Sequence, residues 1–93
     1  MNTLTCDELA ERLSNLLDVQ GHASTPVDAG GEADAVDWFW ARSPIDAEVY
    51  VQQRLVYALR RLGTPRTVGD PPNDARIALG AHAHLLRLQG GAE

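Results

Sequence analysis

The sequence has a single cysteine and no lysine among its 93 residues. With Cys6 alone, no disulfide can form within the chain, and a zinc site built from several thiolates is excluded. All eight basic residues are arginine, which we interpret as an effect of genomic base composition. We expect neither a cofactor nor a bound metal.

Long apolar runs are also missing. No run approaches the roughly 20 residues that a membrane-spanning helix needs. Acidic residues follow the first few positions, where a secretory signal would be basic and then apolar. We therefore expect a cytoplasmic protein. A composition of 44% hydrophobic and 23% charged residues is typical of a globular chain, and the length predicts a single domain over residues 1–93.

Signals for catalysis are absent as well. No serine carries the motif of a nucleophile elbow, and a small core leaves little volume for a substrate cleft. His82 and His84 would diverge by about 200° on a helix, so they cannot share a metal. On the apolar side of that helix, His82 is expected to be a hydrogen-bonded core residue. We expect no enzymatic activity.

The charges are unevenly distributed along the chain. Residues 1–49 carry ten acids and two arginines, whereas residues 50–93 carry six arginines and three acids. One explanation is a basic surface for an acidic partner. The other is that the two halves pack against each other, so that their opposite charges offset one another.

Residues 43–63 give the strongest helix signal. Ser43 can cap the helix, Pro44 suits its first position, Asp46 sits where the acid of a capping box belongs, and Gly63 can end it. At roughly 100° per residue, one half of the helix is apolar and is expected to be buried. That half comprises Ile45, Val49, Val51, Leu55, Val56, Ala58, Leu59 and Leu62.

The polar side of the same helix has its own pattern. Tyr50, Arg54, Tyr57 and Arg61 recur at i, i+4, i+7 and i+11, so they form one stripe of alternating rings and guanidinium groups. Tyrosine and arginine are enriched at the hot spots of protein interfaces. We predict a partner-binding surface here, with stacking between exposed side chains as the structural alternative.

A first helix is expected to begin near Cys6. Thr5 can cap it, Glu8 can complete a capping box, and Gly21 can end it. Cys6 would lie on the side of the leucines, beside two acids. We interpret it as a small buried residue, since a reactive thiolate needs an accessible and electropositive setting.

Between these helices, we predict a β-hairpin. Val36, Trp38 and Trp40 alternate with Asp37 and Phe39, as in a strand, and a weak first strand is expected around residues 23–27 with a turn at residues 28–31. A helix from residue 32 to residue 41 is the alternative. Trp38 and Trp40 would share one face of the strand, either in the core or at a binding surface.

A last helix is expected after the proline-rich connector, capped by Asn73 or a neighbour and ending by residues 90–91. It is apolar around most of its circumference, and Gly80 could allow another backbone to approach closely. We therefore predict a homodimer or partner interface through residues 74–89.

Together these patterns predict an α-dominated α+β domain with the order helix, β-hairpin, helix, helix; the alternative is an all-α domain of four helices. The predicted function is that of a noncatalytic protein-interaction module, a docking or adaptor domain or a small inhibitor. The predicted partner-binding residues are Trp38, Trp40, Tyr50, Arg54, Tyr57 and Arg61. The alternative is a small nucleic-acid-binding regulator that uses the arginines of the second half, among them Arg60, Arg61, Arg66 and Arg76.

Overall fold

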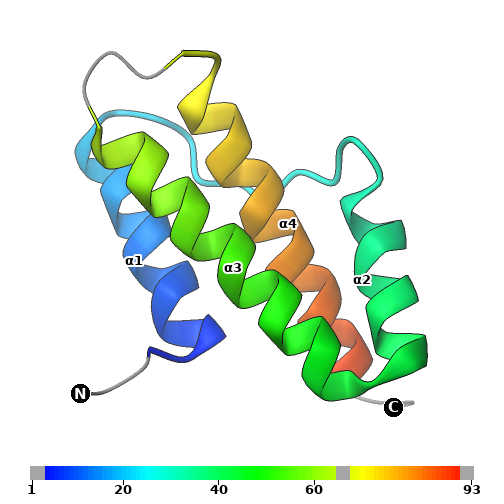
Figure 1. Ribbon diagram of the computed structural model, residues 1–93. Helices are drawn as coiled ribbons and strands as arrows, with labels where there is room; N and C mark the ends of the chain where they lie inside the picture. Colours follow the sequence, from blue (N-terminus) through cyan, green and yellow to red (C-terminus); the bar gives the residue numbers. More distant parts are fainter. Residues whose placement is uncertain (1–3, 65–67, 91–93) are drawn as a thin grey trace.

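The computed structural model describes residues 4–64 and 68–90, which form four α-helices and no strand. The helices are α1 (Cys6–Val19), α2 (Glu32–Arg42), α3 (Pro44–Gly63) and α4 (Pro71–Gln89) (Figure 1). The fold is an all-α domain of four helices, so the predicted α+β class is wrong and the all-α alternative is correct.

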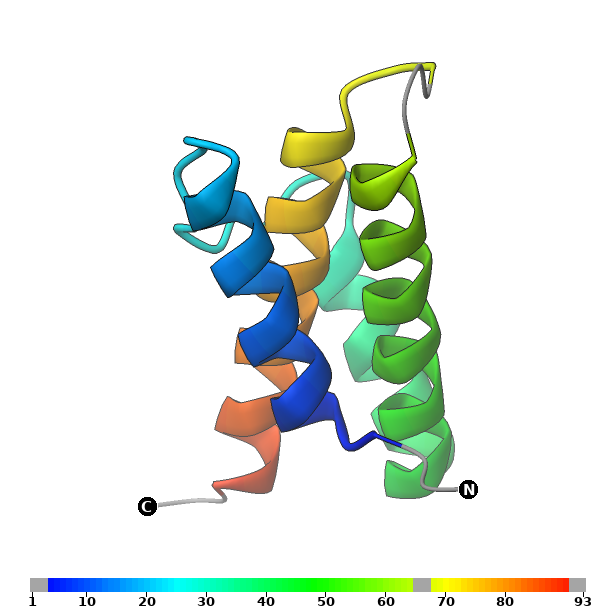
Figure 2. The same cartoon turned by 90° about the vertical axis from the view of Figure 1, so that its left-hand side faces the viewer.

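The helices are not arranged as a square bundle. α3 and α4 pack against each other as a central pair, and α1 and α2 lie on opposite sides of this pair, as Figure 1 shows. Each outer helix contacts both central helices, and no contact joins α1 to α2 over the described residues. One long side of α3 is therefore left open to solvent, and in Figure 2 this helix runs along one edge of the molecule.

The predicted helix starts at Thr5 and Ser43 are confirmed. Thr5 forms a full capping box with Glu8, and the Ser43 hydroxyl accepts a hydrogen bond from the backbone N–H of Ile45. In α4 the capping residue is Asp70, whose carboxylate accepts from the N–H of Asn73, so the helix begins three residues earlier than an Asn73 cap would allow. These caps satisfy N–H groups that a helix leaves unpaired at its first turn.

The predicted β-hairpin is wrong. Residues 20–31 form an irregular connector, and the stretch assigned to the second strand is the helix α2. Helical spacing turns Val36, Phe39 and Trp40 toward the other helices, with Val36 fully buried and the two rings packed against the core. Trp38, which a strand would place beside Trp40, instead points to solvent and is 54% exposed.

The connector between α1 and α2 crosses α4. The backbone N–H of Val27 donates to the carbonyl of Arg76 at 3.0 Å. A Cβ built on Gly80 would lie 2.2 Å from the Val27 carbonyl oxygen. The close approach expected at Gly80 is therefore made within the chain, by the connector.

The core is aliphatic and lies between the central pair and the two outer helices. Its largest fully buried side chains are Leu13, Leu17, Val36, Val51, Leu55 and Leu85. No polar or charged residue of the described chain is buried. None of the described helices has the length and apolar character needed to cross a membrane.

Candidate functional site

The first half of the predicted tyrosine and arginine stripe binds α2. The Tyr50 hydroxyl donates to Oε1 of Glu32 at 2.8 Å, and Nε of Arg54 donates to the same oxygen at 3.0 Å. The Tyr50 ring also stacks on Phe39, with 4.9 Å between ring centroids. Burial, followed by the hydrogen bond to Glu32, raises the pKa of Tyr50 to about 12. Tyr50 and Arg54 thus hold α2 against α3.

Arg61, at the other end of the stripe, binds the start of α4. Its Nε lies 3.1 Å from Oδ2 of Asp74, and its guanidinium also donates to the carbonyl of Val68. The guanidinium lies 5.6 Å from the centroid of the Tyr57 ring. Tyr57 is itself 51% exposed. Of the four residues in the stripe, Tyr57 is the one that presents most of its surface to solvent.

The two tryptophans have different surroundings. Trp40 is half-buried and packs against the core, whereas Trp38 is exposed on α2. The rings of Trp38 and Phe39 form a T-shaped pair, and the Arg42 guanidinium lies 4.6 Å from the centroid of the Trp38 ring. The structure does not bring the six predicted residues into one open surface; it leaves Trp38 and Tyr57 exposed and places the others in contacts within the chain.

Sequence reasoning missed a second apolar face on α3. The buried positions of this helix are Ala47, Val51, Leu55, Ala58 and Leu62. Ile45 and Val49, which were expected among them, are 70% and 44% exposed. At 100° per residue, Ile45, Val49 and Val56 fall within about 40° of one another, on the side of the helix away from the buried positions. The wide apolar half is in fact two stripes, one facing inward and one facing outward.

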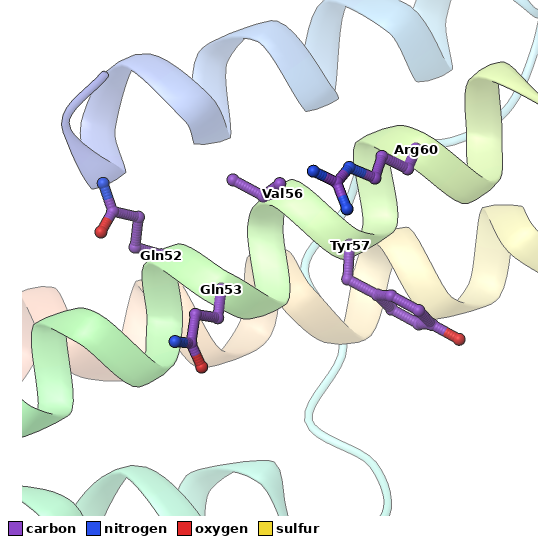
Figure 3. Close-up of a pocket in the computed structure, with 5 residues that line it drawn as sticks. All are labelled: Gln52, Gln53, Val56, Tyr57 and Arg60. Carbon is purple, nitrogen blue, oxygen red and sulfur yellow. The ribbon is translucent and has the colours of Figure 1, made fainter. Parts of the chain in front are cut away.

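Shallow hollows follow this outward face, which we define as Ile45, Asp46, Val49, Gln52, Gln53, Val56, Tyr57 and Arg60. One hollow, of about 580 Å³, is lined by Gln52, Gln53, Val56, Tyr57 and Arg60. In Figure 3 all five side chains come from one stretch of α3, and the Tyr57 ring projects away from the helix. A second hollow, of about 140 Å³, lies toward α2 and is lined by Phe39, Asp46, Val49, Tyr50 and Gln53. Gln53 separates the two.

Opposite charges mark the two ends of the outward face. Asp46 lies in the first turn of α3 and Arg60 in the last, and both are exposed. Neither side chain forms an ion pair with any described residue. A partner on this face would therefore meet a negative charge at one end and a positive charge at the other.

The arginines of the second half are mostly engaged inside the chain. Arg54 pairs with Glu32 and Arg61 with Asp74, and Arg76 bonds the side chain of Asn73. Arg87 lies 3.1 Å from His84. Arg66 lies outside the described residues. These contacts leave no continuous row of free guanidinium groups on the described surface for a phosphate backbone.

The two histidines of α4 face opposite neighbours. Nε2 of His82 lies 2.8 Å from Asp7 on α1, and Nε2 of His84 lies 2.7 Å from Asp37 on α2. The predicted divergence of the pair is confirmed, and each ring links α4 to one outer helix. The described residues contain no group of three side chains suited to holding a metal ion.

Cys6 is partly buried beside the core. Its thiol donates to the carbonyl of Glu48 at 3.4 Å. Burial, together with the nearby charges of Glu48 and Asp7, raises the pKa of the Cys6 thiol. These surroundings oppose formation of the thiolate and agree with a structural role.

Comparisons with protein-family models, with curated proteins and with solved structures each find no match for this chain. The outward face of α3 combines exposed apolar side chains, hollows and two charged side chains that form no ion pair with the described residues.

Proposed function

We propose that this domain is a noncatalytic protein-interaction module that binds a partner protein through the outward face of α3. The observation that carries the proposal is the second apolar stripe, which includes Ile45 and Val49, on a helix whose other side already fills the core. Val56, the third member of the stripe, is partly buried against the core, whereas Ile45 and Val49 are exposed and do not belong to the core cluster. Burial of the stripe by a partner would remove apolar surface from water and stabilise a complex.

The composition of the face fits an interface. Tyr57 supplies a large exposed ring between Gln53 and Arg60, and tyrosine is common among interface hot spots. Polar side chains accompany the apolar ones, as at many interfaces: Asp46 and Arg60 lie at the two ends of the face, and Gln53 lies between its two hollows. The exposed Trp38 on α2 can extend the contact, since its neighbour Phe39 lines the second hollow.

This surface replaces part of the one predicted from the sequence. It retains Tyr57 and Trp38 and adds Ile45, Val49 and Val56. Tyr50, Arg54 and Arg61 support the helix from within the chain, so their substitution is expected to act first on stability. A docking domain, an adaptor or a small inhibitor could each use a face of this kind.

The test is photo-crosslinking in cells with a benzophenone amino acid placed at residue 53 of the full chain. The matched control places the same residue at position 15, which is exposed on α1, away from α3. We expect a protein adduct from position 53 and none from position 15. Adducts of equal yield from both positions, or from neither, would refute the proposed surface. Adducts with nucleic acid instead of protein would favour the nucleic-acid alternative.

A further inference from the structure

We propose that the partner on the outward face of α3 is a second copy of this chain, with the two α3 helices antiparallel across a two-fold axis that passes beside Gln53. This inference rests on the proposed function and names its partner. It differs from the homodimer predicted from the sequence, which used residues 74–89 of α4, because the interface proposed here is on α3.

The outward face is self-complementary about Gln53. Val49 and Tyr57 lie four residues to either side of Gln53, and Asp46 and Arg60 lie seven residues to either side. Spacings of four and seven residues keep side chains on one face of a helix. All five residues are exposed. A two-fold axis at Gln53 therefore sets Val49 against Tyr57 and Asp46 against Arg60, twice in each dimer.

The α3 residues that line the two hollows follow the same symmetry, although the hollows differ in volume. The hollow that includes Tyr57 and Arg60 lies on one side of Gln53, and the hollow that includes Asp46 and Val49 lies on the other. The antiparallel arrangement puts each hollow of one copy over the other hollow of its partner. The projecting Tyr57 ring can then enter the hollow lined by Phe39, Val49 and Tyr50. Aromatic rings in such contacts favour stacked or edge-to-face arrangements.

The charges select this orientation. In the antiparallel dimer each Asp46 meets an Arg60, and neither residue has an ion pair within the described part of its own chain. A parallel arrangement would place Asp46 against Asp46 and Arg60 against Arg60. Like charges brought together across an interface oppose association, so the pattern favours the antiparallel form over the parallel one.

The size of the face suits a reversible dimer. α3 has 20 residues and is therefore about 30 Å long. A standard interface buries about 800 Å² on each partner, roughly one-seventh of the 5833 Å² surface of this chain. One helix with its two flanks covers at most an area of this order. We therefore expect a dimer that forms and dissociates with concentration.

The face of α4 offers less to a second copy. α1, α2 and α3 all pack against this helix, and the connector covers it at Gly80. Leu86 is the one large apolar side chain of α4 that is more than a third exposed. Leu86 therefore provides a control position, because its exposure of 43% nearly equals the 44% of Val49.

The experiment is sedimentation equilibrium of the purified chain over a concentration series from low micromolar to millimolar. We expect the native chain to associate into a dimer, Val49→Arg to remain monomeric, and Leu86→Arg to associate like the native chain. Circular dichroism melting confirms that each variant is folded. A native chain that stays monomeric at millimolar concentration would overturn the inference. Association that Leu86→Arg abolishes and Val49→Arg preserves would overturn it in favour of the α4 face.

Charge reversal tests the register. Asp46→Arg alone sets arginine against arginine, and Arg60→Asp alone sets aspartate against aspartate, so each variant should associate at least tenfold more weakly than the native chain. An equimolar mixture of the two variants restores opposite charges at both ends. We expect that mixture to form a heterodimer. A mixture as weakly associated as its components would overturn the proposed register and with it the two-fold arrangement.

The outcomes separate this inference from the proposed function. A monomeric native chain combined with a cellular adduct between residue 53 and a different protein would leave the interaction module standing and remove the homodimer. A monomeric chain with no adduct at residue 53 would remove both. An adduct at residue 53 between two copies of the chain would support both.

Discussion

The main chain of Val27 lies against Gly80, so that the carbonyl oxygen of Val27 stands 2.2 Å from the place where a Cβ of residue 80 would be. The N–H of Val27 is also bound to the carbonyl of Arg76, one turn before Gly80 on α4. The absence of a side chain at residue 80 is thus what lets the connector cross α4. This contact fixes the path from α1 to α2 over an otherwise apolar helix.

We predict that Gly80→Ala destabilises the domain despite the better helix propensity of alanine. The propensity gain is about 1 kcal/mol, whereas forcing the connector off the helix costs typically about 1–3 kcal/mol in overpacking and also strains the Val27 hydrogen bond. The net loss should therefore be as much as about 2 kcal/mol, measured by urea unfolding.

Gly63→Ala is the matched control for that variant. Gly63 is the last residue of α3, and nothing lies within 4 Å of a Cβ built there. Its substitution should leave the free energy of unfolding unchanged or raise it by less than about 1 kcal/mol. Equal stability of the two variants would contradict the role assigned to Gly80.

A second prediction concerns Glu32, whose carboxylate accepts hydrogen bonds from both Tyr50 and Arg54. Replacing it with alanine leaves the Arg54 guanidinium, 29% exposed in its side chain, without its anion. Hydrogen bonds to charged groups contribute about 1.5–3 kcal/mol, and partial exposure reduces this by screening. We expect Glu32→Ala to lower the free energy of unfolding by about 1–2 kcal/mol. Asp34→Ala, at an exposed position in the same first turn of α2, should change it by less than about 0.5 kcal/mol.

A third prediction follows from the raised pKa of Tyr50, which is about 12 against a usual value of 10.0. The folded state holds this proton more tightly than the unfolded state. The contribution of Tyr50 to stability is therefore complete below pH 10 and is lost as the pH rises toward 12. Absorbance titration of Tyr57→Phe, in which Tyr50 is the sole tyrosine, should give a midpoint near 12.

The control for this prediction is the pH dependence of stability in the Tyr50→Phe variant, compared with that of the native chain. Phenylalanine keeps the stacking on Phe39 and removes the ionisable hydroxyl. The loss of stability between pH 10 and 12 should therefore be smaller in Tyr50→Phe than in the native chain. An identical pH dependence in both proteins would show that the Tyr50 hydroxyl is not the titrating group.

The helix starts at Thr5 and Ser43 could be predicted from the sequence because their signals are local. A capping residue and its hydrogen-bond partner lie within three positions of each other, so their identities determine the geometry. The same reasoning identified α3 from Ser43 to Gly63. The inward stripe of this helix was also recognised, since its positions recur with the helical period.

The error at α2 arose where local signals conflicted. Val36, Trp38 and Trp40 alternate as in a strand, but Val36, Phe39 and Trp40 also follow the helical spacing. The choice depended on whether a second strand existed nearby. Residues 20–31 instead bond to α4 through Val27, so no strand was present to pair with. In the helix, Val36 is buried, and Phe39 and Trp40 pack against the core.

The candidate site could be predicted only in part. Tyr57 and Trp38 were identified by their residue types, but the roles of Tyr50 and Arg54 depend on Glu32, which is at least 18 residues away in the sequence. Ile45 and Val49 were assigned to the core because an apolar half of a helix does not reveal how much of it other elements cover. The positions of α1 and α2 beside the central pair determine which part of α3 is covered and which part is exposed.

The most direct measurement of the outward face of α3 is disulfide formation at residue 53 in the absence of the native thiol. The protein carries Cys6→Ser and Gln53→Cys, and the control carries Cys6→Ser and Asn15→Cys, with a thiol on α1. Two cysteines beside a two-fold axis can reach the separation that a disulfide requires. Under mild oxidation at equal concentration, the account predicts rapid formation of a covalent dimer through residue 53 and slow formation through residue 15. Equal rates from the two positions would contradict it.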